Sequence, residues 1–176
     1  MKSSKDHPMN GTVEVDEMVV GQRQEGVRGR EKSKKKLVIL GIEKKGKGVS
    51  RMYARVIDRT SEKQFKPFFK DHIDENANVK VDGWRSYRPL KQDYPNLKQE
   101  LSGKKGDNFS DIHRCIMMLK SWLRGVQHSV NDLQEYLDEY CYRFNRSFIK
   151  GEIFDNLLGR AVQHSLVFLK RNRLSA

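Results

Sequence analysis

The chain has 176 residues, of which 36% are hydrophobic and 33% charged, so it is long enough for one domain with a buried core. Its 35 Lys and Arg residues oppose 23 Asp and Glu residues, and the net charge of +12 favours a polyanionic partner over the alternative of a merely basic surface. No apolar stretch approaches the ~20 residues of a membrane span and no signal peptide begins the chain, so we expect a soluble, cytoplasmic protein.

The first third of the chain predicts an antiparallel meander. Residues 1–10 are polar and lack periodicity, which is typical of a flexible N-terminal tail. A strand-like run over 12–20 leads into 21–36, whose glycines and many basic residues predict a mobile basic loop. Two further strands are expected over 36–45 and 49–58, the second from its alternation of apolar and polar residues. Because short glycine-containing links are typical of hairpins, we expect neighbouring strands to run antiparallel.

The rest of the chain changes gradually from strands to helices. A helix is expected over 60–74, then a strand over 78–84, a short irregular or helical link, and a last strand over 96–102. Apolar residues then recur at helical spacing in three segments, which predict helices over 109–125, 130–144 and 153–169. The order β-β-β-α-β-α-β, followed by helices, predicts a mixed α/β sheet with helices packed on it and a helical C-terminal part.

The two cysteines, Cys115 and Cys141, both fall within helical patterns. They form no CxxC pair, which excludes a zinc ribbon within this chain and makes a disulfide framework unexpected. We therefore expect both to be small core residues in a reducing compartment.

Two near-copies of one strand each end in an aspartate. "VEVDEM" delivers Asp16 and "VKVDGW" delivers Asp82, 66 positions later (82 − 16 = 66). A carboxylate at a strand end is costly to bury unless a cation compensates it. Mg²⁺ and Mn²⁺ prefer carboxylate oxygens, and ions held this way activate nucleophiles in phosphoryl transfer. The repeat therefore indicates a divalent-metal site, with ordinary turn aspartates as the alternative.

Three ordered blocks carry a resemblance to a known family. They are "VEVDE", "VDGWRSY" and the most specific block, "IHRCIMMLKSWLRGVQHSVNDLQEYLDEYCYRFNR". Over about residues 11–158 the chain resembles the catalytic domain of bacterial insertion-sequence transposases, in the Merlin-related group of the DDE superfamily. The resemblance implies a ribonuclease-H-like fold, and the element order above agrees with that independently. It also implies DNA as the partner, Mg²⁺ or Mn²⁺ as the cofactor and assembly as a homo-oligomer on DNA.

Residue by residue, the resemblance implies catalytic roles for Asp16, Asp82 and Lys120. The two aspartates match the family's first and second catalytic, metal-binding positions. The third position is usually Asn or Glu, two residues before the lysine, and here it is Met118, 36 residues after Asp82 (118 − 82 = 36). Because a thioether has no useful affinity for Mg²⁺, we expect impaired catalysis, unless Asp111 on the same helix substitutes.

The predicted function is therefore that of a transposase catalytic domain for metal-dependent DNA cleavage and strand transfer, impaired at Met118. The alternatives are a catalytically inactive DNA-binding relic or interaction module, and a metal-dependent nuclease with a rearranged site. Relatives usually carry an N-terminal zinc-ribbon or helical DNA-end-binding region, so we also expect truncation. We expect the catalytic domain over 11–160 and a helix end with a basic tail over 161–176.

Further residues are candidate DNA contacts, each with a structural alternative. The alternative for the basic residues 28–36 is a solvated loop without a partner, and the alternative for Trp84 is packing against the core. For His113, Arg143 and Arg146 the alternative is a hydrogen bond within or at the end of a helix. The candidates are Arg28, Arg30, Lys34, Lys35, Lys36, Trp84, His113, Arg143 and Arg146.

Overall fold

The computed structural model describes residues 7–21, 35–101, 103–126 and 132–163. The chain divides into two compact units, Met1–Asn145 and Arg146–Ala176, and the division comes before the domain boundary expected at residue 160. Nearly all of the basic loop expected over 21–36 lies outside the described residues.

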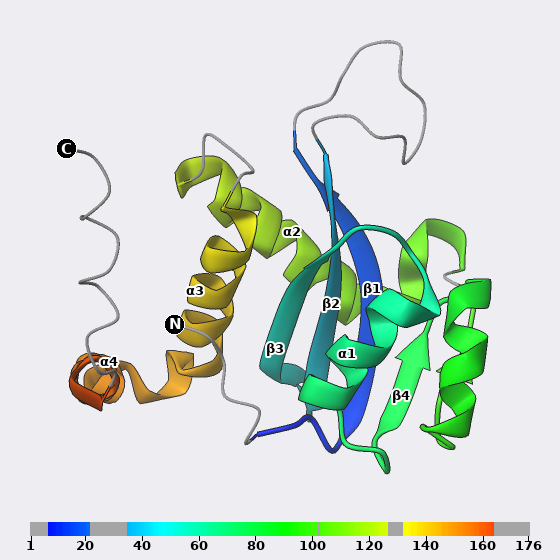
Figure 1. Cartoon of the computed structure of the whole chain (residues 1–176), viewed down its shortest axis with the longest axis horizontal. Helices are drawn as coiled ribbons and strands as arrows, with labels where there is room; N and C mark the ends of the chain where they lie inside the picture. Colours follow the sequence, from blue (N-terminus) through cyan, green and yellow to red (C-terminus); the bar gives the residue numbers. More distant parts are fainter. Residues whose placement is uncertain (1–6, 22–34, 102, 127–131, 164–176) are drawn as a thin grey trace, which may run out of the picture. The chain divides into compact units, whose positions relative to one another are not determined.

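A five-stranded mixed sheet forms the centre of the first unit (Figure 1). Its strands are β1 (Thr12–Val20), β2 (Lys36–Lys45), β3 (Gly48–Ile57), β4 (Asn78–Val81) and β5 (Lys98–Gln99). They lie in the order β3-β2-β1-β4-β5. The pairs β3–β2 and β2–β1 are antiparallel, as the predicted meander requires, whereas β1–β4 and β4–β5 are parallel. This mixed sheet is consistent with the ribonuclease-H-like fold that the resemblance implies.

The helices of the first unit are α1 (Glu62–His72), the 3-10 helices η1 (Arg85–Gln92) and η2 (Lys104–Phe109), α2 (Ser110–Val126) and α3 (Leu133–Asn145). The link between β4 and β5 is a 3-10 helix, which agrees with the short irregular or helical link expected there. Pro89 lies inside η1 and has no backbone N–H, which disfavours an α-helical ladder there. The second unit contains η3 (Ser147–Glu152) and α4 (Ile153–Gln163).

Alternating side chains of the strands build a separate apolar core on each face of the sheet. Val13 and Val15 of β1 pack with α1 and η1, whereas Met18 and Val20 pack with α2 and α3. Both cysteines are free and buried in the second core, which confirms the predicted core role. No helix among the described residues is long and apolar enough to cross a membrane.

Met9 shows that part of the expected N-terminal tail is packed. Its side chain is fully buried in the α1-side core. Its backbone N–H donates to the carbonyl oxygen of His72 at 2.8 Å, and its own carbonyl oxygen accepts from the N–H of Asp74 at 2.9 Å. The expectation of a loose tail therefore does not hold for Met9, because a buried thioether and two backbone hydrogen bonds order it.

Helix α3 covers the edge strand β3 with two carboxamide side chains. Asn145 accepts from the N–H of Met52 at 2.7 Å and donates to the carbonyl oxygen of the same residue at 3.0 Å. Gln134 accepts from the N–H of Val56 at 2.8 Å and donates to the carbonyl oxygen of Ala54 at 3.2 Å. An edge strand exposes unpaired backbone groups, so these side chains take the place of a sixth strand.

Candidate metal centre

Parallel pairing of β1 with β4 explains the repeated aspartate strands. Val13 pairs with Val79 and Val15 with Val81, an offset of 66 residues (81 − 15 = 66). The two aspartates have the same offset, so they follow the last paired residues side by side. Asp16 is still within β1, whereas Asp82 is the first residue after β4. The repeat thus brings two carboxylates together at the carboxyl end of β4.

Asp16 is held by contacts from two elements. Its Oδ1 atom accepts a hydrogen bond from the backbone N–H of Glu17 at 2.7 Å. Its Oδ2 atom lies 3.3 Å from Nε2 of His113, on the first turns of α2. Burial raises the pKa of Asp16 above its ordinary value of 3.8, and the charge of Asp82 adds to this; the Glu17 N–H and His113 act in the opposite direction.

Asp82 is fixed by the turn that follows β4. Its Oδ1 atom accepts from the backbone N–H of Trp84 at 2.9 Å. The side-chain amide of Gln99, on β5, donates to the carbonyl oxygens of Trp84 at 2.8 Å and Asp82 at 3.4 Å. An aspartate that accepts from the N–H two residues ahead stabilises a tight turn, which accounts for the "DGW" sequence at this position.

A third carboxylate, Glu17, completes an acidic cluster that sequence reasoning missed. One carboxylate oxygen from each of Asp16, Glu17 and Asp82 lies within 4.8 Å of the others, and each side chain is partly buried. Strand alternation argues against such a meeting, because consecutive residues point to opposite faces of a sheet. The available signal was only that Glu17 follows Asp16 directly.

The donor set fits a hard divalent ion. Carboxylate oxygens are the ligands that Mg²⁺ and Mn²⁺ prefer, and no described thiolate lies in the cluster that would select a softer metal. All three side chains are partly buried, so the arrangement can hold a divalent ion at the edge of the core.

Helix geometry places Met118 and Lys120 differently around α2 relative to His113. Each α-helical residue turns about 100°, so Met118, five residues after His113, lies about 140° around α2 from it. Met118 is 48% exposed. Lys120 is seven residues after His113, only about 20° away in angle but ~10 Å further along the axis. His113, proposed from the sequence only as a DNA contact, is thus the α2 residue in contact with the cluster.

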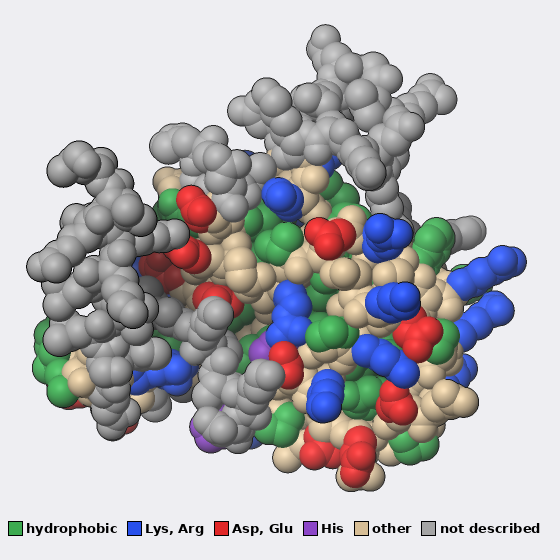
Figure 2. All heavy atoms as spheres, viewed as in Figure 1, with side chains coloured by type: hydrophobic (Ala, Val, Ile, Leu, Met, Phe, Trp, Pro, Cys, Tyr) green, Lys and Arg blue, Asp and Glu red, His purple; other side chains and the backbone are tan. Residues whose placement is uncertain are grey.

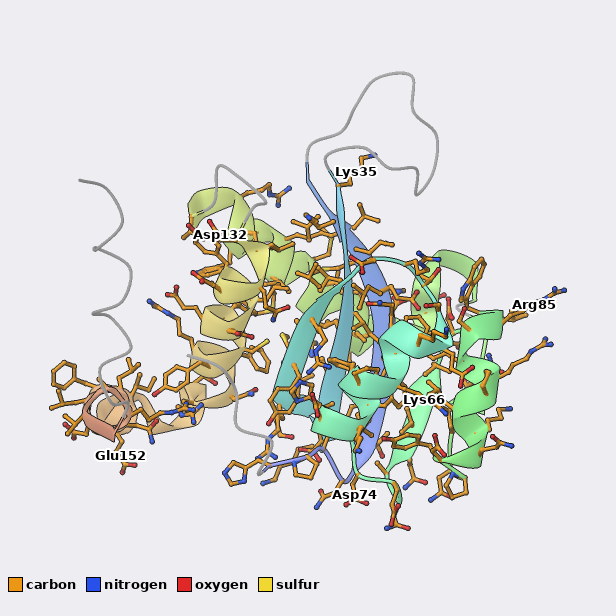
Figure 3. The ribbon with its side chains drawn as sticks, in the orientation of Figure 1. Lys35, Lys66, Asp74, Arg85, Asp132 and Glu152 are labelled. Atoms are coloured by element: carbon orange, nitrogen blue, oxygen red, sulfur yellow. The ribbon has the colours of Figure 1, made fainter. Side chains whose placement is uncertain are left out.

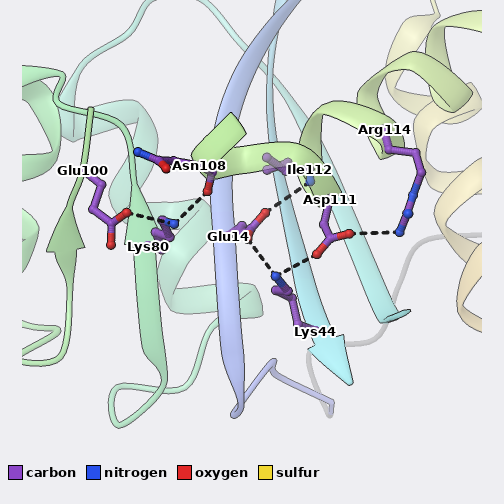
Figure 4. A network of polar contacts seen from close by, with 8 residues as sticks. All are labelled: Glu14, Lys44, Lys80, Glu100, Asn108, Asp111, Ile112 and Arg114. Atoms are coloured by element: carbon purple, nitrogen blue, oxygen red, sulfur yellow. Dashed lines mark hydrogen bonds and ion pairs between the residues drawn. The ribbon is translucent and has the colours of Figure 1, made fainter. Parts of the chain in front are cut away.

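A network of polar contacts fixes the start of α2 against the sheet (Figure 4). Glu14, on β1 and only 3% exposed, accepts from the backbone N–H of Ile112 at 3.2 Å and from Nζ of Lys44 at 3.3 Å. Lys44 also lies 2.7 Å from Asp111, which in turn pairs with Arg114 at 3.0 Å. Asp111 is therefore engaged away from the cluster. Glu14 satisfies an N–H of the first helical turn, which has no partner within the helix.

The candidate DNA contacts are spread over several elements. Arg28, Arg30 and Lys34 lie outside the described residues. Lys36 pairs with Val20, four residues beyond Asp16 along β1, and Lys35 stands beside it at the start of β2 (Figure 3). On the face drawn in Figure 2, basic side chains over α1 and η1 alternate with acidic ones and form no continuous patch.

The other three candidates differ in their surroundings. Trp84, two residues after Asp82, is 46% exposed. Arg143 pairs with Glu139 at 2.7 Å along α3. Arg146 begins the second unit.

Residues 8–145 match a family model described as the ISXO2-like transposase domain. The matched segment contains the whole sheet, the acidic cluster and α2 and α3, and it ends where the first compact unit ends. A comparison with curated proteins gave no match.

Proposed function

We propose that this chain, which belongs to the ISXO2-like transposase domain family, cuts and joins DNA strands of an insertion sequence with the help of Mg²⁺ or Mn²⁺. The observation that carries the proposal is the in-register pairing of β1 with β4, which brings Asp16 and Asp82 together beside His113. A ribonuclease-H-like fold, in which a catalytic centre sits at adjacent strand ends, agrees with this arrangement.

Asp16 and Asp82 are the residues that would hold the metal. A divalent ion bound there supplies activation of the attacking hydroxyl and stabilisation of the leaving oxygen. The chain's own groups prepare the ligands: the Glu17 N–H and His113 orient Asp16, and the Trp84 N–H orients Asp82. Preorganised ligands need little rearrangement when the phosphodiester arrives.

His113, rather than Met118, is the side chain that we assign to the third position. The 3.3 Å contact with Asp16 and the position of Met118 on another side of α2 support the assignment. If His113 fills the third position, the methionine at 118 takes no ligand away from the centre. The catalytic impairment expected from Met118 would then have no structural basis. Lys120, on the same side of α2 as His113, is proposed to contact a phosphate.

DNA is the proposed partner, and the net charge of +12 supports it. Lys35, Lys36 and Trp84 are proposed to contact it, because Lys36 pairs with Val20 on the strand that carries Asp16 and Trp84 lies two residues after Asp82. Assembly as a homo-oligomer on DNA and a cytoplasmic location remain proposals that follow from family membership.

Nicking of supercoiled plasmid in Mn²⁺ tests the function. We expect Asp16→Asn and Asp82→Asn to lower nicking by at least about 100-fold, because each removes a charged ligand while keeping the shape of the side chain. Glu62→Gln, which removes the charge of an exposed carboxylate on α1, serves as the matched control and is expected to nick like the wild type. Equal nicking by all four proteins would refute the assignment of the centre.

Two α2 variants in the same assay separate the candidates for the third position. We expect His113→Ala to lower nicking by about 10-fold or more and Met118→Asn to change it little. A large gain in Met118→Asn together with an unchanged His113→Ala would instead restore Met118 as the defective position.

A further inference from the structure

We propose that Glu17 supplies a third carboxylate ligand to the metal held by Asp16 and Asp82. The inference rests on the proposed function, since it names a further residue of the same centre. It assigns a role to a residue that neither strand alternation nor the aspartate repeat points to.

Glu17 lies on β1, two residues beyond Val15, which is the last β1 residue that pairs with β4. Alternation along β1 sends Asp16 toward α2 and Glu17 toward η1, on opposite faces of the sheet. The neighbouring strand β4 ends at Val81, so no β4 strand residue separates the two faces beyond that point. Asp82, in the turn that follows, therefore meets both side chains at the open edge.

Distances within the cluster come close to what a small ion requires. Ligand oxygens about 2.1 Å from a six-coordinate ion are separated from one another by roughly 3 to 4.2 Å. One oxygen from each of the three carboxylates lies within 4.8 Å of the others. The three oxygens therefore need to draw only slightly closer to share one ion.

A buried tyrosine lies next to Glu17. Tyr87, on η1, is fully buried, and the Glu17 carboxylate is among the groups close to its hydroxyl. Its ring stacks on Phe65, with 4.6 Å between ring centroids and 20° between planes, so the tyrosine is held firmly in the core beside Glu17.

Charge alone is the competing explanation, because any nearby carboxylate attracts a cation. Two variants distinguish it from ligation. Glu17→Gln removes the charge but keeps the size of the side chain and one oxygen. Glu17→Asp keeps the charge but withdraws the carboxylate by one methylene, so a ligand role is lost while the electrostatic attraction persists.

Mn²⁺ titration by calorimetry of the full chain tests the proposal. The wild type is compared with Glu17→Gln, Glu17→Asp, Asp82→Asn and the control Glu62→Gln, with thermal unfolding to confirm that each variant is folded. We expect both Glu17 variants to bind Mn²⁺ at least about 10-fold more weakly than the wild type, and the control to bind equally.

The outcomes separate this inference from the proposed function. Wild-type affinity in Glu17→Asp, whatever Glu17→Gln does, would overturn ligation by Glu17. If Asp82→Asn then still loses Mn²⁺, the metal centre of the proposed function stands without Glu17. If the wild type binds no Mn²⁺, both proposals fail. Should Glu17→Gln not fold, the Glu17→Asp titration decides by itself.

Discussion

Replacing Glu14 by alanine is expected to lower the free energy of unfolding by about 2–4 kcal/mol. The carboxylate is 3% exposed and accepts from the Ile112 N–H at 3.2 Å and from Lys44 at 3.3 Å. Loss of an acceptor at a helix start costs about 1 kcal/mol, and loss of a buried hydrogen bond to a charged group about 1.5–3 kcal/mol. The sum stays below the ~5 kcal/mol of a fully orphaned buried charge, because Lys44 keeps Asp111 at 2.7 Å.

Glu14→Gln is the matched variant and is expected to lose about half as much. Its amide oxygen can still accept from the Ile112 N–H, whereas its charge toward Lys44 is gone. Thermal and urea unfolding followed by circular dichroism measure both. For a domain of this size, the alanine variant is expected to melt roughly 5–15 °C below the wild type. An alanine variant within 1–2 °C of the wild type, or a glutamine variant as unstable as the alanine variant, would refute the view that Glu14 anchors α2.

Three other predictions follow from contacts in the same unit. Asn145→Ala is expected to cost about 2–4 kcal/mol in urea unfolding, because it leaves an N–H and a C=O of β3 without their side-chain partner; a cost under 0.5 kcal/mol would contradict the edge-covering role. The hydrogen bond from Lys44 holds the pKa of Asp111 below its ordinary value of 3.8. The stability from that pair is therefore complete above about pH 4 and is lost as the pH falls through the folded-state pKa. The melting-temperature difference between wild type and Asp111→Asn should be constant from pH 7 to about 5 and shrink below 3.8, and a difference that persists at pH 2 would contradict the pairing. Burial raises the pKa of Cys115 to about 11 and also raises that of Cys141, so a thiol-specific disulfide reagent at pH 8 should label neither before unfolding, and rapid labelling of the native protein would show the core to be open.

The bounds of β2 and β3 were predicted closely, because alternation and apolar runs depend only on residues that are neighbours in the sequence. The alternation in β3 and the apolar run in β2 gave both strands within a residue of their bounds. The repeat around Asp16 and Asp82 also indicated a tertiary contact, since an equal offset in a parallel pair puts the two carboxylates side by side. That inference needs only the register of two strands.

Features that depend on tertiary geometry escaped prediction. Glu17 joins the cluster because β4 ends one residue before Asp82, and no sequence period encodes where a neighbouring strand stops. His113, expected only as a DNA contact, lies 3.3 Å from Asp16. Asn145 covers an edge strand through Met52, which lies 93 residues earlier in the chain.

Anomalous diffraction from crystals soaked in Mn²⁺ would locate the metal bound by this chain. We expect a peak at the end of β4 within about 2.2 Å of carboxylate oxygens of both Asp16 and Asp82. A carboxylate oxygen of Glu17 at the same distance would support the further inference. Saturating Mn²⁺ that gives no peak there, or one bound by other residues, would contradict the account.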